Sequence, residues 1–310
     1  MEKPLISYVV TAYNIERFVR EAVECAFAQT YSPLEIVLSD DCSSDRTFEI
    51  MKKMAAEYRG PHKIKLNRNE SNLGITRHMN KAYLELAEGE IIIAAHGDDI
   101  SIPDRTRLSY EFLRDNPDVT AVSLSMKSVD SAGRENGTDD ACVDSVKFYG
   151  FAGGGNIPAP SRAFYKKVMT VFGPLSDDCP TEDELISFRA LMLGRNAFLP
   201  QVGVLYRKHS ASSSNPGNFA KFPLEKIIDQ QLADMDKAIA VGLITPRQKE
   251  EKKAALLKGM ACRKTYRRYF AAPTFPNLLR LLTSPLFPLR TKCHFIIDHF
   301  RRKRLMKSAR

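Results

Sequence analysis

Several signatures of common protein classes are missing from this chain of 310 residues. It has no tryptophan, so any aromatic ring that packs against a ligand must come from Tyr or Phe. Its six cysteines include no Cys-x-x-Cys pair, which argues against a zinc ribbon, a redox motif and a disulfide framework. There is no Gly-x-Gly-x-x-Gly after the first apolar segment, no P-loop, no Gly-x-Ser-x-Gly and no His-Glu-x-x-His. Dehydrogenase, P-loop, hydrolase and zincin functions therefore have no motif to support them.

Long hydrophobic runs are also absent. No apolar stretch approaches the roughly 18 residues that a membrane-spanning helix needs. The first residues run directly into an apolar segment at 5–10, without the basic and long apolar regions of a secretory signal. We therefore expect a cytoplasmic protein, in keeping with its scattered cysteines. With 44% hydrophobic residues the chain can bury a full core, in one large domain or two modest ones.

Positive charge is concentrated at the C-terminal end. Residues 247–310 hold 18 Lys and Arg against 3 Asp and Glu, a net charge of +15, which leaves −6 for residues 1–246 of the total +9. A nucleic-acid-binding protein would spread basic residues over its folded domain. An acidic body with a basic extension instead indicates an enzyme with an electrostatic anchor, and we expect no nucleic acid as a partner.

The first half alternates between the periods of strands and helices. Strands are predicted at 5–10, 34–38, 64–66, 91–95 and 119–124, with helices over 18–27, 48–58 and 75–87 and one that ends near 116. This alternation predicts an α/β fold with a doubly wound, mostly parallel sheet. Helical spacing is also seen over 161–172 and 182–193, and throughout the residues after 214. The linker-like residues 211–217 place a boundary between a domain at 1–214 and a basic helical extension at 215–310.

Two adjacent carboxylates follow the most apolar of these strands. Five apolar residues at 91–95 lead through His96 and Gly97 to Asp98 and Asp99. The carboxyl ends of such strands are where open α/β sheets bind ligands, and paired acids there can hold a divalent cation beside substrate phosphates. The alternative is a solvated helix cap, a role that Ser101 or Asp104 fits better.

The ends of the first two strands carry polar groups that suit a nucleotide. A carboxylate such as Asp41 can accept hydrogen bonds from a base N–H or a ribose hydroxyl. Turn composition is the alternative, and it accounts for Ser43 and Ser44 better than for Asp41. Thr11 and Tyr13 offer a hydroxyl and a ring able to stack on a base, although a helix start would explain them equally well.

A third acidic site opens the helix predicted over 182–193. Glu182, Asp183 and Glu184 lie in its first turn, where the helix dipole alone favours acidic residues. The functional alternative is general base catalysis, in which a carboxylate takes the proton of an attacking hydroxyl.

Six short motifs follow one another in the order found in a known enzyme family. They lie at residues 9–14, 28–45, 72–80, 97–105, 181–183 and 206–209. With these residues the chain resembles the family 2 glycosyltransferases of the GT-A fold from about residue 4 to residue 214, and six ordered matches are far more specific than one. The resemblance implies inverting transfer from a nucleotide-sugar donor, expected to be a UDP-sugar. It also implies a divalent metal, Mn²⁺ or Mg²⁺, and a glycan or lipid-linked saccharide as acceptor.

Carried over by position, the resemblance assigns roles at the donor site. It implies that Thr11 and Tyr13 contact the nucleotide, that Asp41 contacts the base and that Arg77 belongs to the same donor-binding set. Asp98 would reach the ribose or the metal-bound phosphate.

The same resemblance implies a metal site and a catalytic base. Asp99 would be the metal ligand, assisted by Asp98 and by His209 beside the diphosphate. Asp183 would be the base, and Glu182 would orient the acceptor or the groups that surround it. The first acid of the family's Asp-x-Asp pattern is Gly97 here, and His96 is an unusual neighbour, so the metal would have one direct protein carboxylate.

Two other functions compete with this interpretation. A sugar-nucleotide nucleotidyltransferase shares the nucleotide-binding plan, but its Gly-rich basic loop is missing from residues 11–17. A catalytically inactive carbohydrate- or nucleic-acid-binding module would use the basic tail. That tail is itself open to two interpretations, a peripheral anchor on an anionic membrane face or helices packed on the catalytic domain.

Overall fold

Four parallel strands form the N-terminal half of the sheet. In the computed structural model, which describes residues 2–135, 157–209, 223–287, 292 and 295–296, strand β1 (Ile6–Ala12) pairs with β2 (Leu34–Asp40) and β4 (Ile91–His96), and β2 pairs with β3 (Lys63–Arg68). Every residue of β1 and β2 is buried, as expected for parallel strands covered on both faces. The four strands predicted in this region are confirmed.

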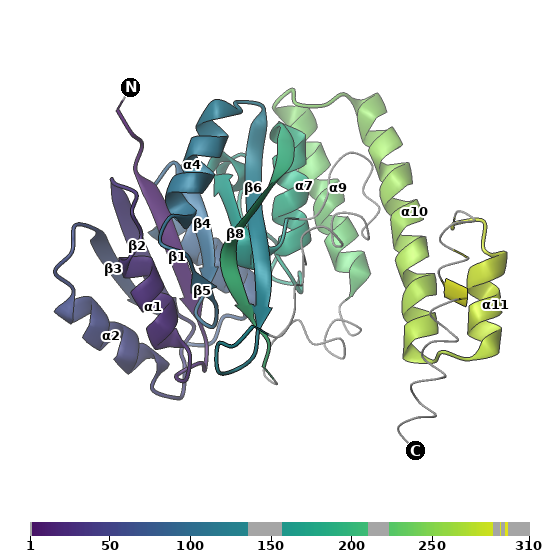
Figure 1. Ribbon diagram of the computed structural model, residues 1–310. Helices are drawn as coiled ribbons and strands as arrows, with labels where there is room; N and C mark the ends of the chain where they lie inside the picture. The colour runs from purple at the N-terminus through teal and green to yellow at the C-terminus, as the bar shows by residue number, and fades with distance from the viewer. Residues whose placement is uncertain (1, 136–156, 210–222, 288–291, 293–294, 297–310) are drawn as a thin grey trace, which may run out of the picture. The chain divides into compact units, whose positions relative to one another are not determined.

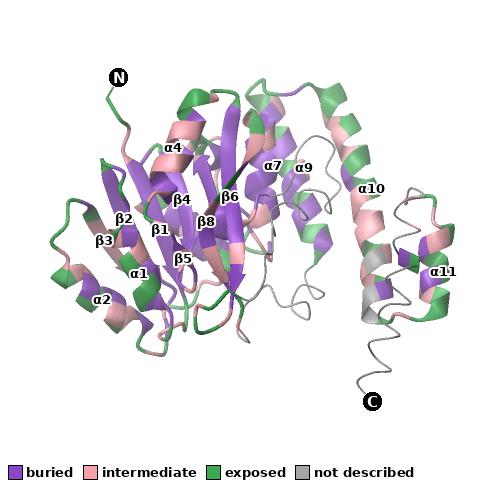
Figure 2. Ribbon diagram, viewed as in Figure 1, coloured by how far each residue is buried: buried purple, intermediate pink, exposed green. Residues whose placement is uncertain are grey.

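Helices cover both faces of these strands (Figure 1). Successive strand residues point to opposite sides, and Ile6, Tyr8 and Val10 share a hydrophobic core with α1 (Val19–Phe27) and α2 (Thr47–Glu57). The π-helix η1 (Lys81–Leu86), which continues α3 (Ile75–Asn80), also packs on β1 and β2. Figure 2 shows the buried strands and the exposed outer faces of α1 and α2. The structure confirms the helices predicted over 18–27, 48–58 and 75–87.

The second half of the sheet mixes strand directions. Strand β6 (Val119–Val129) is parallel to β8 (Arg195–Arg207) and antiparallel to β7 (Arg162–Tyr165), which joins it to β4, and β5 (Ile100–Ser101) pairs with the end of β8. The order of the eight strands is β3-β2-β1-β4-β7-β6-β8-β5. Helix α4 (Arg105–Asp115) packs on β6. The predicted fold class, an α/β protein with a mostly parallel sheet flanked by helices, is confirmed.

Two strands differ from the sequence-based expectation. The prediction of a helix over 161–172 is wrong for its first part, where residues 162–165 form β7, and only α6 (Lys167–Thr170) is helical. Four residues are too short to display the period of a strand, and pairing between β4 and β6 decides their conformation. Strand β8 was not predicted, because it contains Pro200, which cannot donate a ladder hydrogen bond. Its register with β6 shifts between Leu199 and Val202, which places Pro200 at an irregularity.

The C-terminal part of the chain is helical. Helix α7 (Asp183–Leu193) confirms the helix predicted over 182–193, and α9 (Leu224–Ala240), α10 (Pro246–Ala271) and α11 (Phe275–Thr283) follow. Internal contacts divide the chain into Met1–Ser212 with Glu225–Pro246, and Ser213–Leu224 with Arg247–Arg310. The linker-like residues 211–217 lie outside the described residues, and the boundary after 214 stays a prediction. Among the helices that the structure describes, none combines the length and apolar character of a membrane span.

Candidate active site

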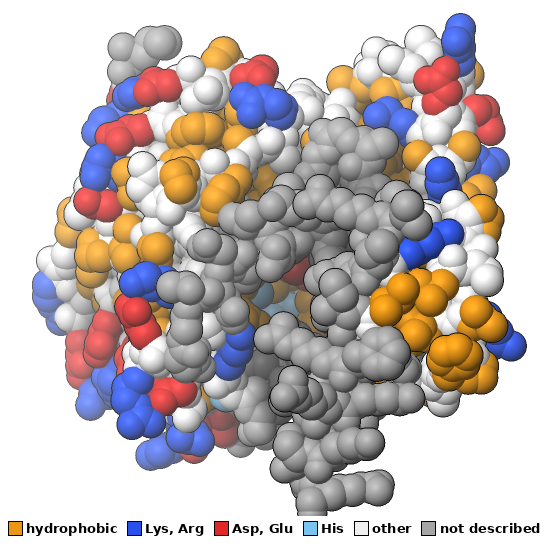
Figure 3. Space-filling view, turned by 45° about the vertical axis from the view of Figure 1, so that its right-hand side comes forward, with side chains coloured by type: hydrophobic (Ala, Val, Ile, Leu, Met, Phe, Trp, Pro, Cys, Tyr) orange, Lys and Arg blue, Asp and Glu red, His pale blue; other side chains and the backbone are white. Residues whose placement is uncertain are grey.

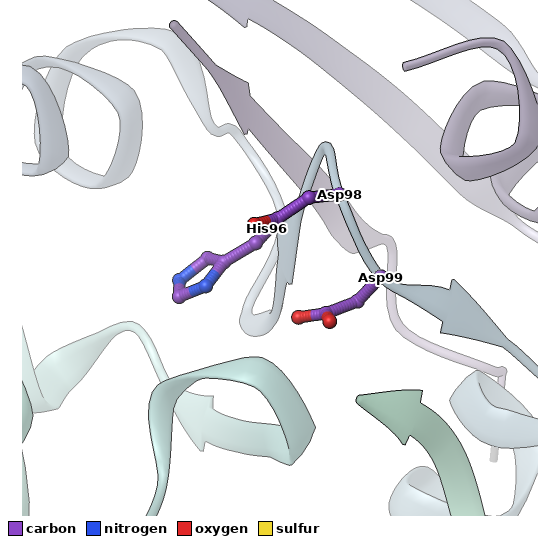
Figure 4. A group of neighbouring side chains, drawn as sticks. All are labelled: His96, Asp98 and Asp99. Atoms are coloured by element: carbon purple, nitrogen blue, oxygen red, sulfur yellow. The ribbon is translucent and has the colours of Figure 1, made fainter. Parts of the chain in front are cut away.

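The turn after β4 gathers three side chains that can bind a cation. His96 is the last residue of β4 and lies opposite Thr11 in the β1 register, and the Gly97 N–H donates to the Thr11 carbonyl at 2.9 Å. A tight turn then closes through the Asp99 N–H, which is 3.3 Å from the His96 carbonyl. Figure 4 shows His96, Asp98 and Asp99 projecting from this turn. Their ligand atoms lie within 4.8 Å of one another.

The end of β8 fixes the two carboxylates. Asp99 Oδ1 accepts a hydrogen bond from the Arg207 main-chain N–H at 2.8 Å, and the Arg207 Nε donates to the Asp98 carbonyl at 2.9 Å. Asp98 Oδ2 lies 2.9 Å from His209 Nε2. The structure therefore brings together the three predicted metal-site residues Asp98, Asp99 and His209, although His209 touches Asp98 rather than joining the cluster of ligand atoms.

The surroundings of the turn shift the pKa values of its three side chains in different directions. Burial, and then the negative charge of Asp98, raise the pKa of the Asp99 carboxyl well above its usual range. Burial also acts to raise the pKa of Asp98, but the hydrogen bond with His209 and the proximity of His96 outweigh it and lower that pKa. Burial lowers the pKa of His96, which favours the neutral imidazole that can act as a ligand.

A cation would satisfy the groups that the protein leaves without a partner. Within the described part of the chain, the buried atoms His96 Nε2 and Asp99 Oδ2 have no hydrogen-bond partner. Unpaired buried polar atoms are costly and need an explanation, and a carboxylate oxygen with an imidazole nitrogen is a donor set that divalent metals accept. The residues present thus fit a metal ion. His96 was not predicted as a ligand from the sequence, where only its unusual position beside Gly97 marked it.

A second acidic group stands at the start of α7. Arg162 of β7 is fully buried, and its Nη2 lies 3.6 Å from Glu182 Oε1 and 3.7 Å from Asp183 Oδ1. Arg162 Nη1 also donates to the Asp183 carbonyl at 3.1 Å. The two acids differ in access to solvent, because the Glu182 side chain is 4% exposed and that of Asp183 is 35% exposed. Asp183 is therefore the one that a substrate can reach, and Arg162, which sequence reasoning missed, lies within ion-pair distance of both carboxylates.

The buried environment of Glu182 favours its protonated form. Burial, and then the negative charge of Asp183, raise the pKa of Glu182 to about 8. Carboxyls whose pKa is raised by their surroundings are common at sites of acid–base chemistry. Burial lowers the pKa of His96 and outweighs the charges of Asp98 and Asp183, which act to raise it.

The predicted nucleotide-binding residues lie at the ends of β1 and β2. The Asp41 carboxylate is buried and accepts hydrogen bonds from Asn69 Nδ2 at 2.8 Å, the Leu73 N–H at 2.9 Å and the Gly74 N–H at 3.0 Å. Gly74 has a positive φ of 75°, which a glycine adopts without strain. Asp41 thus orders the loop that leads into α3.

The other predicted donor contacts surround that loop or the end of β1. Arg77 is exposed on α3 and its Nε donates to the Leu73 carbonyl at 2.9 Å. Thr11 is buried beside His96, whereas the Tyr13 ring is 48% exposed and available to stack on a ligand. One edge of the parallel strands carries the end of β1, the turn after β4 and the loop region between Asp41 and Arg77. The roles of their residues in donor binding stay predictions.

Comparison with known sequences identifies the family. The model of glycosyl transferase family 2 matches residues 7–168, more than half of the chain. The chain belongs to glycosyl transferase family 2. The resemblance drawn from the six motifs is confirmed.

Curated relatives of this family 2 chain match it over part of their length. EpsE of Bacillus subtilis (strain 168) is 34% identical over 130 residues, which is 42% of this chain and 46% of EpsE. Poly(ribitol-phosphate) beta-N-acetylglucosaminyltransferase TarS of Staphylococcus aureus (strain Mu50) is 28% identical over 129 residues, which is 41% of this chain and 22% of TarS. The chain thus spans less than half the length of these two relatives.

Solved structures share the fold. The crystal structure of S. aureus TarS 1–349 in complex with UDP-GlcNAc has a TM-score of 0.61 at 18% identity, covering 89% of this chain and 78% of that chain. The mannosyltransferase PcManGT from Pyrobaculum calidifontis, in complex with GDP-Man and Mn²⁺, has a TM-score of 0.57 at 19% identity, covering 97% and 87%. The GT-A fold expected for this family 2 chain is confirmed.

Proposed function

We propose that this chain transfers a sugar from a nucleoside-diphosphate sugar, a UDP-sugar in the first instance, to a hydroxyl of a glycan or lipid-linked saccharide with inversion. The observation that carries the proposal is the cluster of His96, Asp98 and Asp99 after β4, in which His96 Nε2 and Asp99 Oδ2 are buried without a hydrogen-bond partner among the described residues. The neighbours crystallised with UDP-GlcNAc and GDP-Man support the class of donor. The names of TarS and of the E. coli chondroitin synthase support a role in bacterial surface polysaccharide synthesis.

A metal site belongs to this proposal. A bound Mn²⁺ or Mg²⁺ supplies a Lewis acid that stabilises negative charge on the departing diphosphate. His96, Asp98 and Asp99 would hold it. The Arg207 N–H on Asp99 Oδ1 and the His209 contact with Asp98 fix the two carboxylates before any ligand arrives. Such preorganisation avoids the cost of ordering these groups during the reaction.

Proton removal from the acceptor is assigned to Asp183. Its side chain is reachable from solvent, Arg162 Nη2 lies 3.7 Å from its Oδ1, and Arg162 Nη1 donates to its main-chain carbonyl. Burial raises the pKa of the neighbouring Glu182 to about 8, so that carboxyl keeps its proton at pH 7. A hydroxyl deprotonated at Asp183 attacks the anomeric carbon from the face opposite the diphosphate, so that one displacement inverts the centre. No covalent bond to the enzyme is required.

We also propose that the C-terminal extension meets an anionic membrane face, on the cytoplasmic side. Between Glu251 and Asp298 the sequence has ten Lys and Arg and no acid. Helix α11 buries Leu278 and Leu281 in the core of its own unit, while Phe275 is 63% and Leu279 is 49% exposed. Figure 3 shows hydrophobic side chains gathered on this part of the chain, with Lys and Arg around them. Apolar contact combined with positive charge suits the surface of an anionic bilayer.

Turnover of the donor tests the proposed reaction. The full chain is incubated with UDP-GlcNAc and other nucleotide-sugars, with Mn²⁺ or Mg²⁺ and a saccharide acceptor, and UDP release and product are measured. We expect release that depends on the metal and stops with EDTA. Release of pyrophosphate from a nucleoside triphosphate and a sugar phosphate would indicate a nucleotidyltransferase instead. Binding with no nucleoside diphosphate released from any donor would indicate an inactive binding module.

A further inference from the structure

A loop between α6 and α7 connects the two halves of the candidate site. It runs from Leu175 to Thr181 and leads directly into Glu182 and Asp183. Its position therefore sets where the proposed base lies, yet it is a loop with no strand partner to hold it. Hydrogen bonds from two helices hold it in place.

Helix α3 holds one side of this loop through two polar side chains. Thr76 Oγ1 donates to the Cys179 carbonyl at 2.6 Å. Asn80 makes two bonds with Leu175, donating from Nδ2 to the carbonyl at 2.7 Å and accepting from the N–H at 2.8 Å. Thr76 and Asn80 are four residues apart, so they lie on one face of the helix. Both are buried, and each satisfies main-chain groups that would otherwise be unpaired.

Helix α9 holds the other side. Gln230 Oε1 accepts from the Ser176 N–H at 2.8 Å, and Lys226 Nζ contacts Asp178 Oδ2 at 3.0 Å. The loop is thus fixed between two helices. Helix α3 differs from α9 in what lies next to its first residue.

The start of α3 belongs to the donor side of the site. The N–H groups of Leu73 and Gly74, immediately before the helix, donate to the Asp41 carboxylate. Six residues of helix separate Gly74 from η1, and Thr76 and Asn80 lie within them. A short, rigid element therefore joins the loop ordered by Asp41 to the loop that delivers Asp183.

We propose that Thr76 and Asn80 are positioning residues, which hold the 175–181 loop so that Asp183 meets an acceptor hydroxyl beside a donor bound at the Asp41 end of α3. This inference rests on the proposed transfer reaction and on Asp183 as its base. Neither residue needs to touch a substrate. A displacement of about 1 Å at a reacting group can lower the rate by ~10²-fold, so the loss of one anchor should be visible in kcat.

The test compares two isosteric substitutions that each remove one buried threonine hydroxyl. Thr76→Val removes the bond to the loop, and Thr120→Val removes an equally buried bond of 2.6 Å to the Ala190 carbonyl near the far end of α7. We expect Thr76→Val to lower kcat at least ~10-fold, with the Kd for UDP and Mn²⁺ changed less than about threefold. Thr76→Ser, which keeps the hydroxyl, should restore kcat. Thr120→Val should lose comparable thermal stability and keep kcat.

Two further measurements keep the inference separate from the proposed reaction. Asn80→Asp retains the acceptor for the Leu175 N–H and loses the amide donor, and we expect the same loss of kcat. Hydrogen exchange of the 175–181 amides needs no turnover, and it should quicken in Thr76→Val and not in Thr120→Val. If the wild type turns over donor and Asp183→Asn does not, but Thr76→Val keeps kcat, the positioning role is wrong and the reaction stands. Equal losses of kcat in both valine variants, or unchanged loop exchange, would also overturn it.

Discussion

The main-chain N–H of Arg207 holds Asp99 Oδ1 at 2.8 Å although the two residues are 108 positions apart. The other oxygen, Oδ2, is buried without a partner among the described residues. Burial next to Asp98 raises the pKa of Asp99, so the folded protein bears a cost for keeping a carboxyl there. A residue that destabilises the fold and is nevertheless held in one orientation fits a ligand-binding role, since sites trade stability for function.

Replacement of Asp99 by Asn should separate stability from metal binding. The amide keeps an acceptor for the Arg207 N–H and removes a poorly solvated acid, so the melting temperature of the metal-free protein should rise. The Kd for Mn²⁺, followed by calorimetry or electron paramagnetic resonance, should increase at least ~10-fold. Asp104→Asn removes a half-buried acid five residues away that pairs with Arg107, and it should leave Mn²⁺ affinity unchanged. Equal Mn²⁺ affinity in Asp99→Asn and wild type would contradict the metal assignment.

Substitution of Asp183 should affect the chemical step. Asp183→Asn is nearly isosteric and cannot accept the proton, so transfer should fall by at least ~10²-fold with the Kd for UDP little changed. Single-turnover rates and UDP binding, measured on the same preparation, check both parts. Glu182→Gln is the matched variant, since it replaces the acid that the structure buries. If Glu182→Gln lost more activity than Asp183→Asn, the two roles would be reversed.

The pH dependence of stability should report Glu182. Its pKa is about 8 in the folded protein against an ordinary value of 4.5. Between these values the folded protein keeps a proton that the unfolded chain has released, so the free energy of unfolding decreases as pH rises from about 4.5 to 8. The slope from this group is on the order of 1 kcal/mol per pH unit. Urea denaturation at pH 5 to 8 should show a flatter profile in Glu182→Gln, and the wild-type slope in the control Glu184→Gln.

Local patterns in the sequence were sufficient to predict much of the fold. A run of five apolar residues before His96 can only be buried on both faces, which identifies β4 as a central parallel strand. The carboxyl ends of such strands meet at one edge, which is why Asp41, Asp98 and Asp99 could be grouped. Strands β7 and β8 could not be predicted in this way, because their pairing partners are distant in sequence and their own patterns are short or interrupted by Pro200.

The support around the site was beyond the reach of sequence patterns. Arg162 lies in a segment with helical spacing, and its contact with Asp183, 21 residues later, arises from the pairing of β7 with β4. The hydrogen bond from Arg207 to Asp99 likewise depends on tertiary structure. His96 could be noticed as unusual, but only the turn through Gly97 and Asp98 shows that its ring projects with the acids.

The C-terminal extension should bind anionic vesicles through α11. Each Lys or Arg near such a surface contributes about 1 kcal/mol, and the exposed Phe275 and Leu279 add apolar contact. In flotation of the full chain at low salt, we expect binding to vesicles with 30% phosphatidylglycerol and none to neutral vesicles. The double substitution Phe275→Ser and Leu279→Ser should weaken binding at least ~10-fold, whereas Val241→Ser, at a 57% exposed residue of the first unit, should not. No flotation of the wild type, or equal flotation of both variants, would show that the extension has another role.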